Sequence, residues 1–173
     1  MALVAVHAGR VRGTISASEA AEFLVSVKSL PSAVQQVLDS EAVIERIAEK
    51  YAESDAFFFI GKAYGHPVAL ESALKLKEIS YDHAEGFPAG ELKHGPLALV
   101  TEDTPVFAIA TGRNDDKLRS NVEEVRARSA PVVAVAEPGS PVAEVADEIL
   151  PIPETHPDLA GILANVQLQL YSY

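Results

Sequence analysis

The chain has 173 residues, of which 48% are hydrophobic, and this length allows one domain with a substantial hydrophobic core. Its formal charge of −11 without a visible basic patch argues against a nucleic-acid partner, and the absence of cysteine excludes disulfides, thiolate zinc sites and a cysteine nucleophile. The sequence has no apolar run of about 18 residues and no N-terminal signal-peptide pattern, so we expect no membrane span and a cytoplasmic location.

The chain begins with helical stretches separated by glycine, serine and proline. The first has no obvious partner within the chain, so we interpret it as the end of a larger architecture. The last predicted helix likewise reaches the final residue without a stop signal. The expected N-terminal helices cover 3–12, ending at Gly13; 18–29, with Ser18 as N-cap; a stretch that begins at Pro31; and 40–52, capped by Ser40.

From residue 56 the pattern changes to short apolar runs that alternate with helical segments. The run from Ala56 to Ile60 is typical of a strand buried on both faces, and Pro151 in the last, weaker run indicates an edge strand. This alternation predicts an α/β fold with a parallel sheet and helices on both faces. The expected strands are 56–60, 105–110, 131–136 and 149–152, and the expected helices begin at Pro67 and cover 115–128, 142–146 and 157–173.

A line of charged residues runs along the helix that begins at Pro67. Glu71, Lys75 and Glu78 are spaced to fall on one narrow face, and Asp82 continues the line. The apolar residues around them are Val68, Leu70, Ala73, Leu74, Leu76 and Ile79. We therefore expect a helix buried on several sides, where a carboxylate beside an ammonium can act as a general base. The alternative is a surface salt bridge worth about 0.3–0.5 kcal/mol.

The loop GKAYGH after the first strand is a candidate anion site. Ligands of parallel sheets bind beyond the carboxyl ends of the strands, and exposed N–H groups at a helix start attract phosphate. Gly61 and Gly65 allow close approach, and Lys62 and His66 add positive charge. The loop contains no Ser or Thr and matches neither the Walker pattern nor GxGxxG, so a plain connecting turn is the alternative.

His94 lies in the segment GELKHGP, where glycine and proline restrict the backbone. An imidazole can exchange protons at neutral pH, which suits acid–base catalysis. A structural or merely exposed histidine is the alternative. Nearby, Asp82, His83 and Glu85 match no common metal-site spacing and no HExxH motif is present, so we expect neither a metal site nor a cofactor.

Residues 69–99, ALESALKLKEISYDHAEGFPAGELKHGPLAL, closely resemble the second sugar-isomerase (SIS) domain of the glutamine–fructose-6-phosphate aminotransferase family. Further matches are SNVEEVRAR at 120–128, PIPETH at 151–156 and VQLQLYSY at 166–173. The segment RVRGTIS at 10–16 is similar to the junction that follows the first SIS domain of that family. The resemblance therefore extends over nearly the whole chain.

The resemblance implies a flavodoxin-like, three-layer αβα sandwich with additional N-terminal helices. Residues 1–15 are then the tail end of a preceding SIS domain with a linker, and residues 16–173 are the second SIS domain, truncated at its C-terminus. The family's glutaminase domain, the phosphate-binding loop of its first SIS domain and the lysine-bearing C-terminal tail all lie outside these 173 residues. We therefore expect a fragment that carries proton-transfer residues but is inactive on its own.

The same resemblance implies a function for three residues. The family converts fructose 6-phosphate and glutamine to glucosamine 6-phosphate and glutamate. Glu78 in KEIS matches the base that moves a proton between C1 and C2 of the sugar, and Lys75 matches the lysine that assists it. His94 matches the histidine that assists ring opening, and it does so in the site of the neighbouring subunit.

The implied partners are the sugar phosphates fructose 6-phosphate and glucosamine 6-phosphate, together with a second copy in a homodimer of the parent enzyme. Weaker candidates for substrate binding are Gly61, Lys62 and Glu71. Two alternatives stay open. One is a stand-alone sugar-phosphate-binding SIS module, which needs no acid–base residues, and the other is a related SIS deaminase that works towards fructose 6-phosphate.

Overall fold

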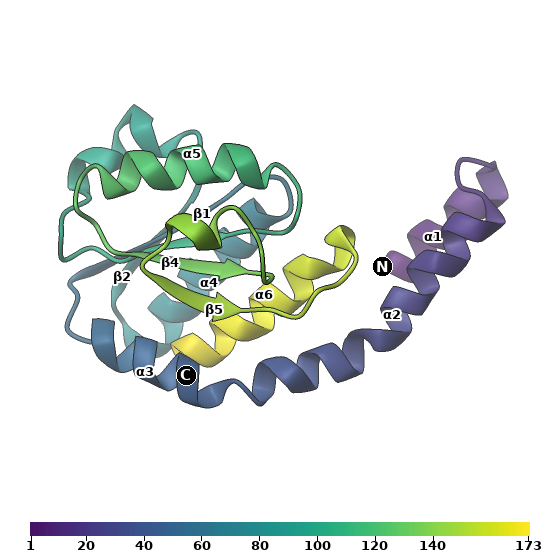
Figure 1. The fold of residues 1–173 in the computed structure, drawn as a ribbon, viewed down its shortest axis with the longest axis horizontal. Coiled ribbons are helices and arrows are strands. Elements are labelled where there is room, and N and C mark those ends of the chain that lie inside the picture. Colours follow the sequence, from purple (N-terminus) through teal and green to yellow (C-terminus); the bar gives the residue numbers. More distant parts are fainter.

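Six helices, five strands and three short 3-10 turns follow one another along the chain, and the computed structural model describes all 173 residues (Figure 1). The helices are α1 (Ala2–Arg12), α2 (Ala17–Leu38), α3 (Glu41–Tyr51), α4 (Gly65–Ser80), α5 (Asp115–Arg126) and α6 (Pro157–Ser172). The strands are β1 (Ala56–Gly61), β2 (His83–Pro88), β3 (Val106–Ile109), β4 (Val132–Ala136) and β5 (Glu148–Pro151). The turns are η1 (Leu92–His94), η2 (Pro96–Leu99) and η3 (Ala143–Val145).

The strands form one parallel sheet in the order β2-β1-β3-β4-β5. Helices α3, α4 and α6 cover one face of the sheet and α5 covers the other (Figure 1). β3 and β4 are buried along their whole length because both faces are covered, which explains their unbroken apolar sequences. The predicted three-layer α/β sandwich is therefore confirmed, and β5 lies at an edge, as Pro151 indicated.

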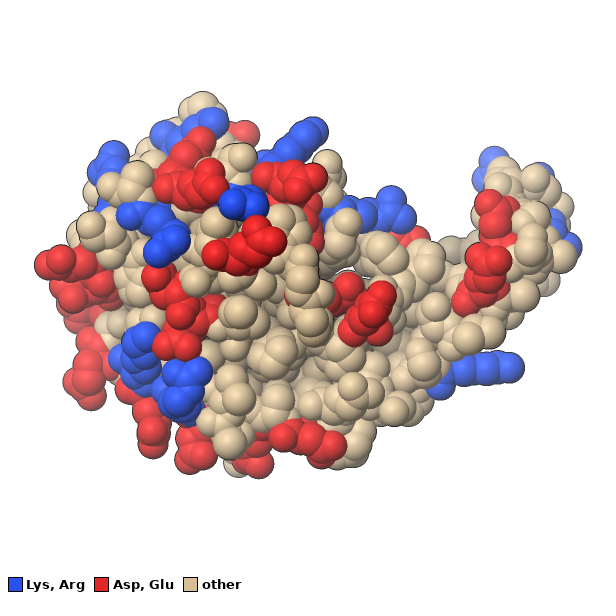
Figure 2. Space-filling view, viewed as in Figure 1, with Lys and Arg blue, Asp and Glu red and all other residues tan.

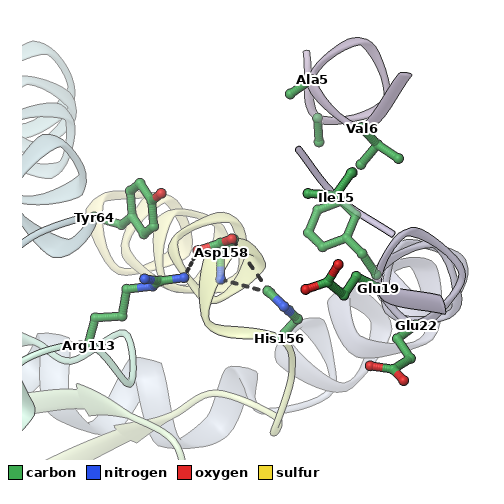
Figure 3. A pocket seen from close by; sticks show the side chains of 11 residues that line it. Ala5, Val6, Ile15, Glu19, Glu22, Tyr64, Arg113, His156 and Asp158 are labelled. Carbon is green, nitrogen blue, oxygen red and sulfur yellow. Dashed lines mark hydrogen bonds and ion pairs between the residues drawn. The ribbon is translucent and has the colours of Figure 1, made fainter. Parts of the chain in front are cut away.

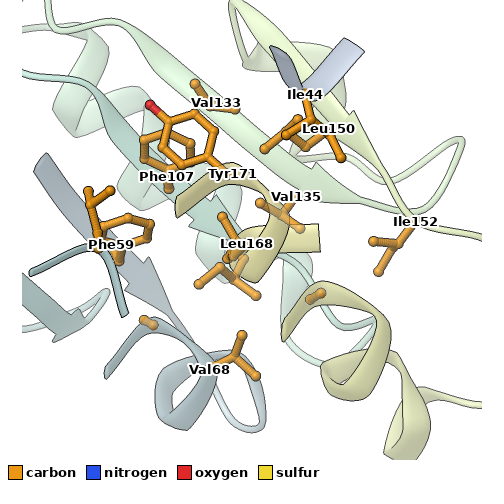
Figure 4. Close-up of a cluster of buried hydrophobic side chains, with 14 of the residues drawn as sticks. Ile44, Phe59, Val68, Phe107, Val133, Val135, Leu150, Ile152, Leu168 and Tyr171 are labelled. Atoms are coloured by element: carbon orange, nitrogen blue, oxygen red, sulfur yellow. The ribbon is translucent and has the colours of Figure 1, made fainter. Parts of the chain in front are cut away.

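Alternate side chains of β1 enter two separate hydrophobic cores. Phe57 and Phe59 join the larger cluster, between the sheet and α3, α4 and α6, whereas Phe58 joins the cluster beneath α5. In the larger cluster the ring centroids of Phe59 and Phe107 lie 4.9 Å apart, and those of Phe107 and Tyr171 lie 4.7 Å apart (Figure 4). This aromatic column joins two central strands to α6 and fixes the helix against the sheet.

Helix α2 runs without a break from Ala17 to Leu38, so the predicted boundary at Pro31 is wrong. A proline inside a helix removes one backbone hydrogen bond and crowds the preceding turn. In α2 this cost is offset by packing on both sides of the proline. Leu30 and Val34 pack against the larger core, and Val37 lies fully inside it.

The N-cap of α2 is Ser16 rather than the predicted Ser18. The Glu19 N–H donates to Ser16 Oγ at 3.1 Å, and the Ser16 N–H donates to Glu19 Oε2 at 2.7 Å. This reciprocal pair is a capping box, and its S-x-x-E spacing is present in the sequence. Ser40 precedes α3 as predicted, but its hydroxyl donates to the Val37 carbonyl instead of capping α3.

Strand β2 is the one element of the sheet that the sequence analysis missed. Helix α4 ends at Ser80, so Asp82 lies beyond the helix and the expectation that it continues the charged line is wrong. Gly86 and Pro88 weaken the strand pattern. A Cβ at Gly86 would lie 2.7 Å from the carbonyl oxygen of Ala69 in α4, so only glycine fits there. Gly86 therefore weakens the strand pattern in the sequence and also allows β2 to pack against α4.

Helix α1 and the first part of α2 form an arm that projects from the sheet and its covering helices, here called the body (Figure 1). No residue of α1 is buried, and Leu3, Val4 and Val11 are exposed. Figure 2 shows charges of both signs over α5 and around α3, whereas few lie where α2 passes α6.

No helix combines the length and the apolar character needed to cross a membrane. The assignment of residues 1–15 to a preceding domain stays a prediction.

Glu148 of β5 ties α3 to the sheet. Its carboxylate accepts hydrogen bonds from Arg46 Nη2 at 3.0 Å and from Lys50 Nζ at 2.6 Å. Its own side chain is 16% exposed, while those of its two partners are about half exposed. The two cationic donors lower the pKa of Glu148 from its usual 4.5 to about 2.

We expect Glu148→Gln to lower the free energy of unfolding by about 1–2 kcal/mol at pH 7, since solvent around the two partners weakens the pair. In the unsubstituted chain this stabilisation is complete above the unfolded-state pKa of 4.5 and is lost as the pH falls towards 2. Urea denaturation between pH 7 and pH 2 measures it. Glu49→Gln, an exposed change on α3, is the matched control. Equal acid sensitivity in Glu148→Gln and the unsubstituted chain would contradict the assignment.

Candidate active site

Helix α4 places the predicted charged residues on one face. Lys75 Nζ donates to Glu78 Oε2 at 2.7 Å and lies 3.8 Å from Glu71 Oε1. The ammonium therefore lies between two carboxylates, one from the preceding turn of the helix and one from the following turn. The hydrogen bond to Glu78 raises the pKa of Lys75, which keeps the lysine charged. A carboxylate held beside an ammonium in this way can accept a proton and return it.

The charged face of α4 is open to solvent in this chain. The side chains of Glu78 and Lys75 are 54% and 31% exposed. Leu70 and Leu74 flank the charged line and are 48% and 43% exposed. The expectation of a helix buried on several sides is therefore wrong, because only one face of α4 reaches the core. The buried residues on that face are Gly65, Val68, Ala69, Ser72, Ala73 and Leu76.

His94 reaches the surface on the other side of the sheet. It ends η1, whose Leu92 is buried in the cluster beneath α5, and the adjacent Lys93 Nζ lies 3.6 Å from Glu124 Oε1 of α5. The His94 side chain is exposed and makes no hydrogen bond or ion pair within the chain. Because α4 covers the opposite face, a single chain does not bring His94 to Glu78.

Gly61 and Lys62 line a cleft of about 410 Å³ at the carboxyl ends of β1 and β2. Lys117 of α5 lines the same cleft and was missed, since no local pattern shows that β3 and its loop lie beside β1. Glu71 and Glu78 do not line this cleft, because α4 begins at the carboxyl ends of the strands and runs towards their amino ends. From the start of α4 to Glu78 the helix rises about 20 Å. Gly61 and Lys62 therefore lie apart from the proton-transfer pair, whereas Glu71, the third binding candidate, lies beside Lys75.

A wider cleft of about 570 Å³ lies between the arm and the body (Figure 3). Arg113 Nη2 donates to Asp158 Oδ1 at 2.6 Å, and its guanidinium lies over the ring of Tyr64. The ring of Phe23 meets that of His156 edge-on at 5.1 Å, and His156 Nδ1 accepts the Asp158 N–H at the start of α6. These contacts fix the start of α6, and none of the predicted site residues lines this cleft.

Two carboxylates brace the loops at the carboxyl edge of the sheet. Asp115 Oδ2 accepts the Gly112 N–H at 3.2 Å and the Ser140 hydroxyl at 3.3 Å, and Glu137 Oε1 accepts the Thr155 N–H at 3.0 Å. Burial raises the pKa of Asp115 and that of Glu137. Their bonds join the loops after β3, β4 and β5 and so position this edge.

Asp82, His83 and Glu85 have no shared ligand geometry. His83 Nε2 lies 3.7 Å from Glu85 Oε1. No group of three or more His, Cys, Asp or Glu side chains in the chain is placed to hold a metal ion.

In a comparison with protein-family models, the family described as "SIS domain" matches residues 50–173 of this chain. An isomerizing glutamine–fructose-6-phosphate aminotransferase from Halobacterium salinarum is 52% identical over 173 residues, which are 99% of this chain and 28% of the relative. Another relative of that name, from Thermus thermophilus, is 46% identical and is covered to 29%. The chain therefore spans less than a third of the length of these curated relatives.

Among solved structures, the C-terminal domain of glucosamine-fructose-6-phosphate aminotransferase from Francisella tularensis is similar with a TM-score of 0.90 at 33% identity, covering 97% of this chain and 48% of that chain. A glucosamine-6-phosphate deaminase from Thermotoga maritima has a TM-score of 0.66 at 28% identity, covering 96% and 46%. With its five-stranded parallel sheet and a family match over residues 50–173, this chain belongs to the SIS domain family.

Proposed function

We propose that this chain supplies the proton-transfer residues of an isomerizing glutamine–fructose-6-phosphate aminotransferase. Such an enzyme converts fructose 6-phosphate and glutamine to glucosamine 6-phosphate and glutamate. The observation that carries the proposal is the 2.7 Å hydrogen bond between Lys75 and Glu78 on one face of α4. The identity of 52% to a relative of that name supports it.

Each of three residues has a distinct role in the proposed reaction. Glu78, as a carboxylate, removes a proton from one of the two sugar carbons C1 and C2 and returns it to the other, so the step consumes no net proton. Lys75 stays protonated and stabilises the ionised carboxylate between the two transfers. His94 exchanges the proton that accompanies opening of the sugar ring.

The proposed site is completed by a second protein surface. Glu78 lies on an open face beside the exposed Leu70 and Leu74, and covering that face would remove water from the carboxylate–ammonium pair. His94 lies on the other side of the sheet of its own chain. A homodimer of the longer protein would supply the covering surface and bring His94 of one copy to Glu78 of the other.

The proposal is tested on the longer protein that contains this chain. With fructose 6-phosphate and glutamine, we expect it to form glucosamine 6-phosphate and glutamate in equal amounts. Chromatography of both products measures this stoichiometry. Glutamate release without any glucosamine 6-phosphate would refute the proposal.

The 173-residue chain alone is expected to be inactive. It carries Lys75 and Glu78, but their face is uncovered, and the relatives are more than three times as long. Incubation with fructose 6-phosphate and ammonium should therefore yield no glucosamine 6-phosphate above a reaction without protein. Sustained turnover would show that these residues form a complete site without a further domain.

The similarity to a glucosamine-6-phosphate deaminase favours a second candidate function. The same carboxylate–ammonium pair would then move the proton in the reverse direction, and glucosamine 6-phosphate and water would give fructose 6-phosphate and ammonium. Release of ammonium from glucosamine 6-phosphate by the longer protein, with no use of glutamine, separates this function from the first.

A further inference from the structure

The imidazole of His94 is not held in place by any polar contact of its own. The side chain is exposed and makes no hydrogen bond or ion pair within the chain. A group that exchanges protons with a substrate must be held within about 0.5 Å of its working position. The placement of this imidazole therefore depends on the residues that fix the backbone around it, at 91–97, here called the His94 segment.

Burial and a tight turn fix the path of this backbone. Leu92 is buried in the cluster beneath α5, and the His94 N–H donates to the Glu91 carbonyl at 3.0 Å. Gly95, with a φ of 153°, separates η1 from η2 in a conformation that favours glycine. These features hold the inner side of η1. They leave its outer side, where Lys93 lies, to be held by a side-chain contact.

That contact comes from α5. Lys93 Nζ lies 3.6 Å from Glu124 Oε1. The other oxygen of this carboxylate, Oε2, accepts a hydrogen bond from Asn121 Nδ2 at 3.3 Å. One oxygen of Glu124 is thus turned towards η1 and the other towards its own helix. The line of contacts from Asn121 through Glu124 to Lys93, here called the α5 bridge, ends at the residue next to His94.

The two flanks of α5 are tied to different parts of the body. On one flank, Arg119 and Arg126 bind carboxylates on η3 and just before β5 at 2.8 and 3.2 Å. At about 100° per residue, Asn121 and Glu124 fall on the opposite flank. The α5 bridge is therefore the ionic connection between α5 and the His94 segment, whereas the arginines serve the other side of the sheet layer.

Asn121 is an unexpected residue at its position. It is only 6% exposed, and the other buried residues of α5 are the apolar Leu118, Val122 and Val125. Its Oδ1 has no hydrogen-bond partner in the chain, which costs stability that an apolar side chain would not. The one hydrogen bond of its side chain is the bond to Glu124. Holding this carboxylate therefore accounts for an amide at position 121.

We propose that Glu124 is a positioning residue for His94, and that Asn121 holds the Glu124 carboxylate for this purpose. The α5 bridge keeps Lys93, and with it η1, against α5, so that the next residue presents its imidazole in one direction. The inference rests on the proposed role of His94 in ring opening. In that step the C2–O5 bond of the sugar breaks, the C2 hydroxyl loses a proton and O5 gains one. His94 exchanges this proton, and Glu124 acts only through His94.

The test compares two substrates of the longer protein, each supplied with glutamine. Fructose 6-phosphate is closed through O5 and must be opened. 5-Deoxyfructose 6-phosphate has no O5, and its phosphate blocks O6, so it stays open-chain and bypasses the step. Glu124→Gln keeps the size of the side chain but removes the charge that faces Lys93. We expect it to lower kcat for fructose 6-phosphate by about threefold to tenfold, with kcat for the open-chain substrate unchanged.

A double-mutant cycle shows whether Glu124 acts through the imidazole. His94→Gln sets the full size of the effect and should slow fructose 6-phosphate more than Glu124→Gln does. Combining the two substitutions should give no further loss beyond His94→Gln, because the group that Glu124 positions is already absent. A further loss in the double variant would overturn the proposal. So would an equal loss on both substrates in Glu124→Gln, which is the result of a merely structural role, or no loss on either.

Two other α5 variants complete the test. Glu123→Gln is the matched control: it removes the neighbouring carboxylate, which is bonded to Arg119 at 3.3 Å, and should leave both rates unchanged. Asn121→Ala removes the donor to Glu124 and should reproduce the selective loss on fructose 6-phosphate. Unchanged rates in a folded Asn121→Ala variant would overturn the α5 bridge. If circular dichroism shows that Asn121→Ala is unfolded, Glu124→Gln, a change at a half-exposed side chain, decides the question.

Failure of this inference and failure of the proposed function give different results. If the longer protein forms no amino sugar from either substrate, the proposed function itself is wrong. If His94→Gln slows both substrates alike, His94 has no specific role in ring opening, and the inference falls with that role. If His94→Gln is selective and Glu124→Gln is not, the inference alone is overturned.

Discussion

Replacing Glu78 with glutamine in the longer protein is expected to lower the rate of glucosamine 6-phosphate formation by about 10²- to 10⁴-fold. Glutamine has nearly the same shape and can still accept the hydrogen bond from Lys75, but it cannot carry a proton. The loss should therefore appear in kcat rather than in KM. Hydrolysis of glutamine should stay measurable, because the role proposed for Glu78 is confined to the sugar. Separate assays of glutamate and glucosamine 6-phosphate distinguish the two effects.

Two further variants sharpen this result. Glu45→Gln changes an exposed glutamate of α3 that makes no ion pair, and it should leave both activities unchanged. Lys75→Gln removes the ammonium that lies 2.7 Å from the carboxylate and should reduce isomerisation less than Glu78→Gln does. Isomerisation at the original rate in Glu78→Gln would show that another group is the base.

Replacing Phe107 with alanine is expected to lower the free energy of unfolding of the chain by about 3–5 kcal/mol. Phe107 is fully buried, and its ring lies between Phe59 and Tyr171 at centroid distances of 4.9 and 4.7 Å. Truncation leaves a cavity between β1, β3 and α6 that the stiff strands cannot close. Urea denaturation followed by circular dichroism measures the change.

The size of this effect depends on the cavity, so a smaller truncation should cost less. Phe107→Leu keeps most of the volume and is expected to cost about 1.5 kcal/mol or less. Leu70→Ala on the outer face of α4 should change stability by less than about 1 kcal/mol, since this leucine is already 48% exposed. A loss for Phe107→Ala no larger than that for Leu70→Ala would contradict the packing described for the aromatic column.

Much of the sheet was predictable because a strand that is covered on both faces has an apolar side chain at every position. The runs at 105–110 and 131–136 show this pattern, and both are strands. The sequence of β2 does not, because Gly86 was selected by its contact with α4 rather than by its strand conformation. The helix boundary predicted at Pro31 was wrong for a related reason. The packing of α2 outweighed the low preference of proline for the interior of a helix.

In the candidate site, too, the features set by local sequence were predictable and those set by tertiary packing were not. The contact between Lys75 and Glu78 was predictable, because it follows from helical geometry within four residues. The exposure of their face was not, because a sequence with apolar residues all around a helix does not say which of them the rest of the chain covers. The meeting of Lys62 and Lys117 depends on the order of the strands, which no local pattern contains.

The position of β1 between β2 and β3 also has a consequence for how the chain folds. Phe58 of β1 pairs with Val106 of β3, so this contact closes a loop of 48 residues (106 − 58). Every neighbouring pair in the sheet is parallel and needs such a crossover, so no hairpin can form early and guide the rest. Closing these loops lowers the entropy of the chain before the hydrophobic cores form and offset that loss. We therefore expect refolding to be slow, on a scale of about milliseconds to seconds. During that interval unpaired strand edges are open to aggregation.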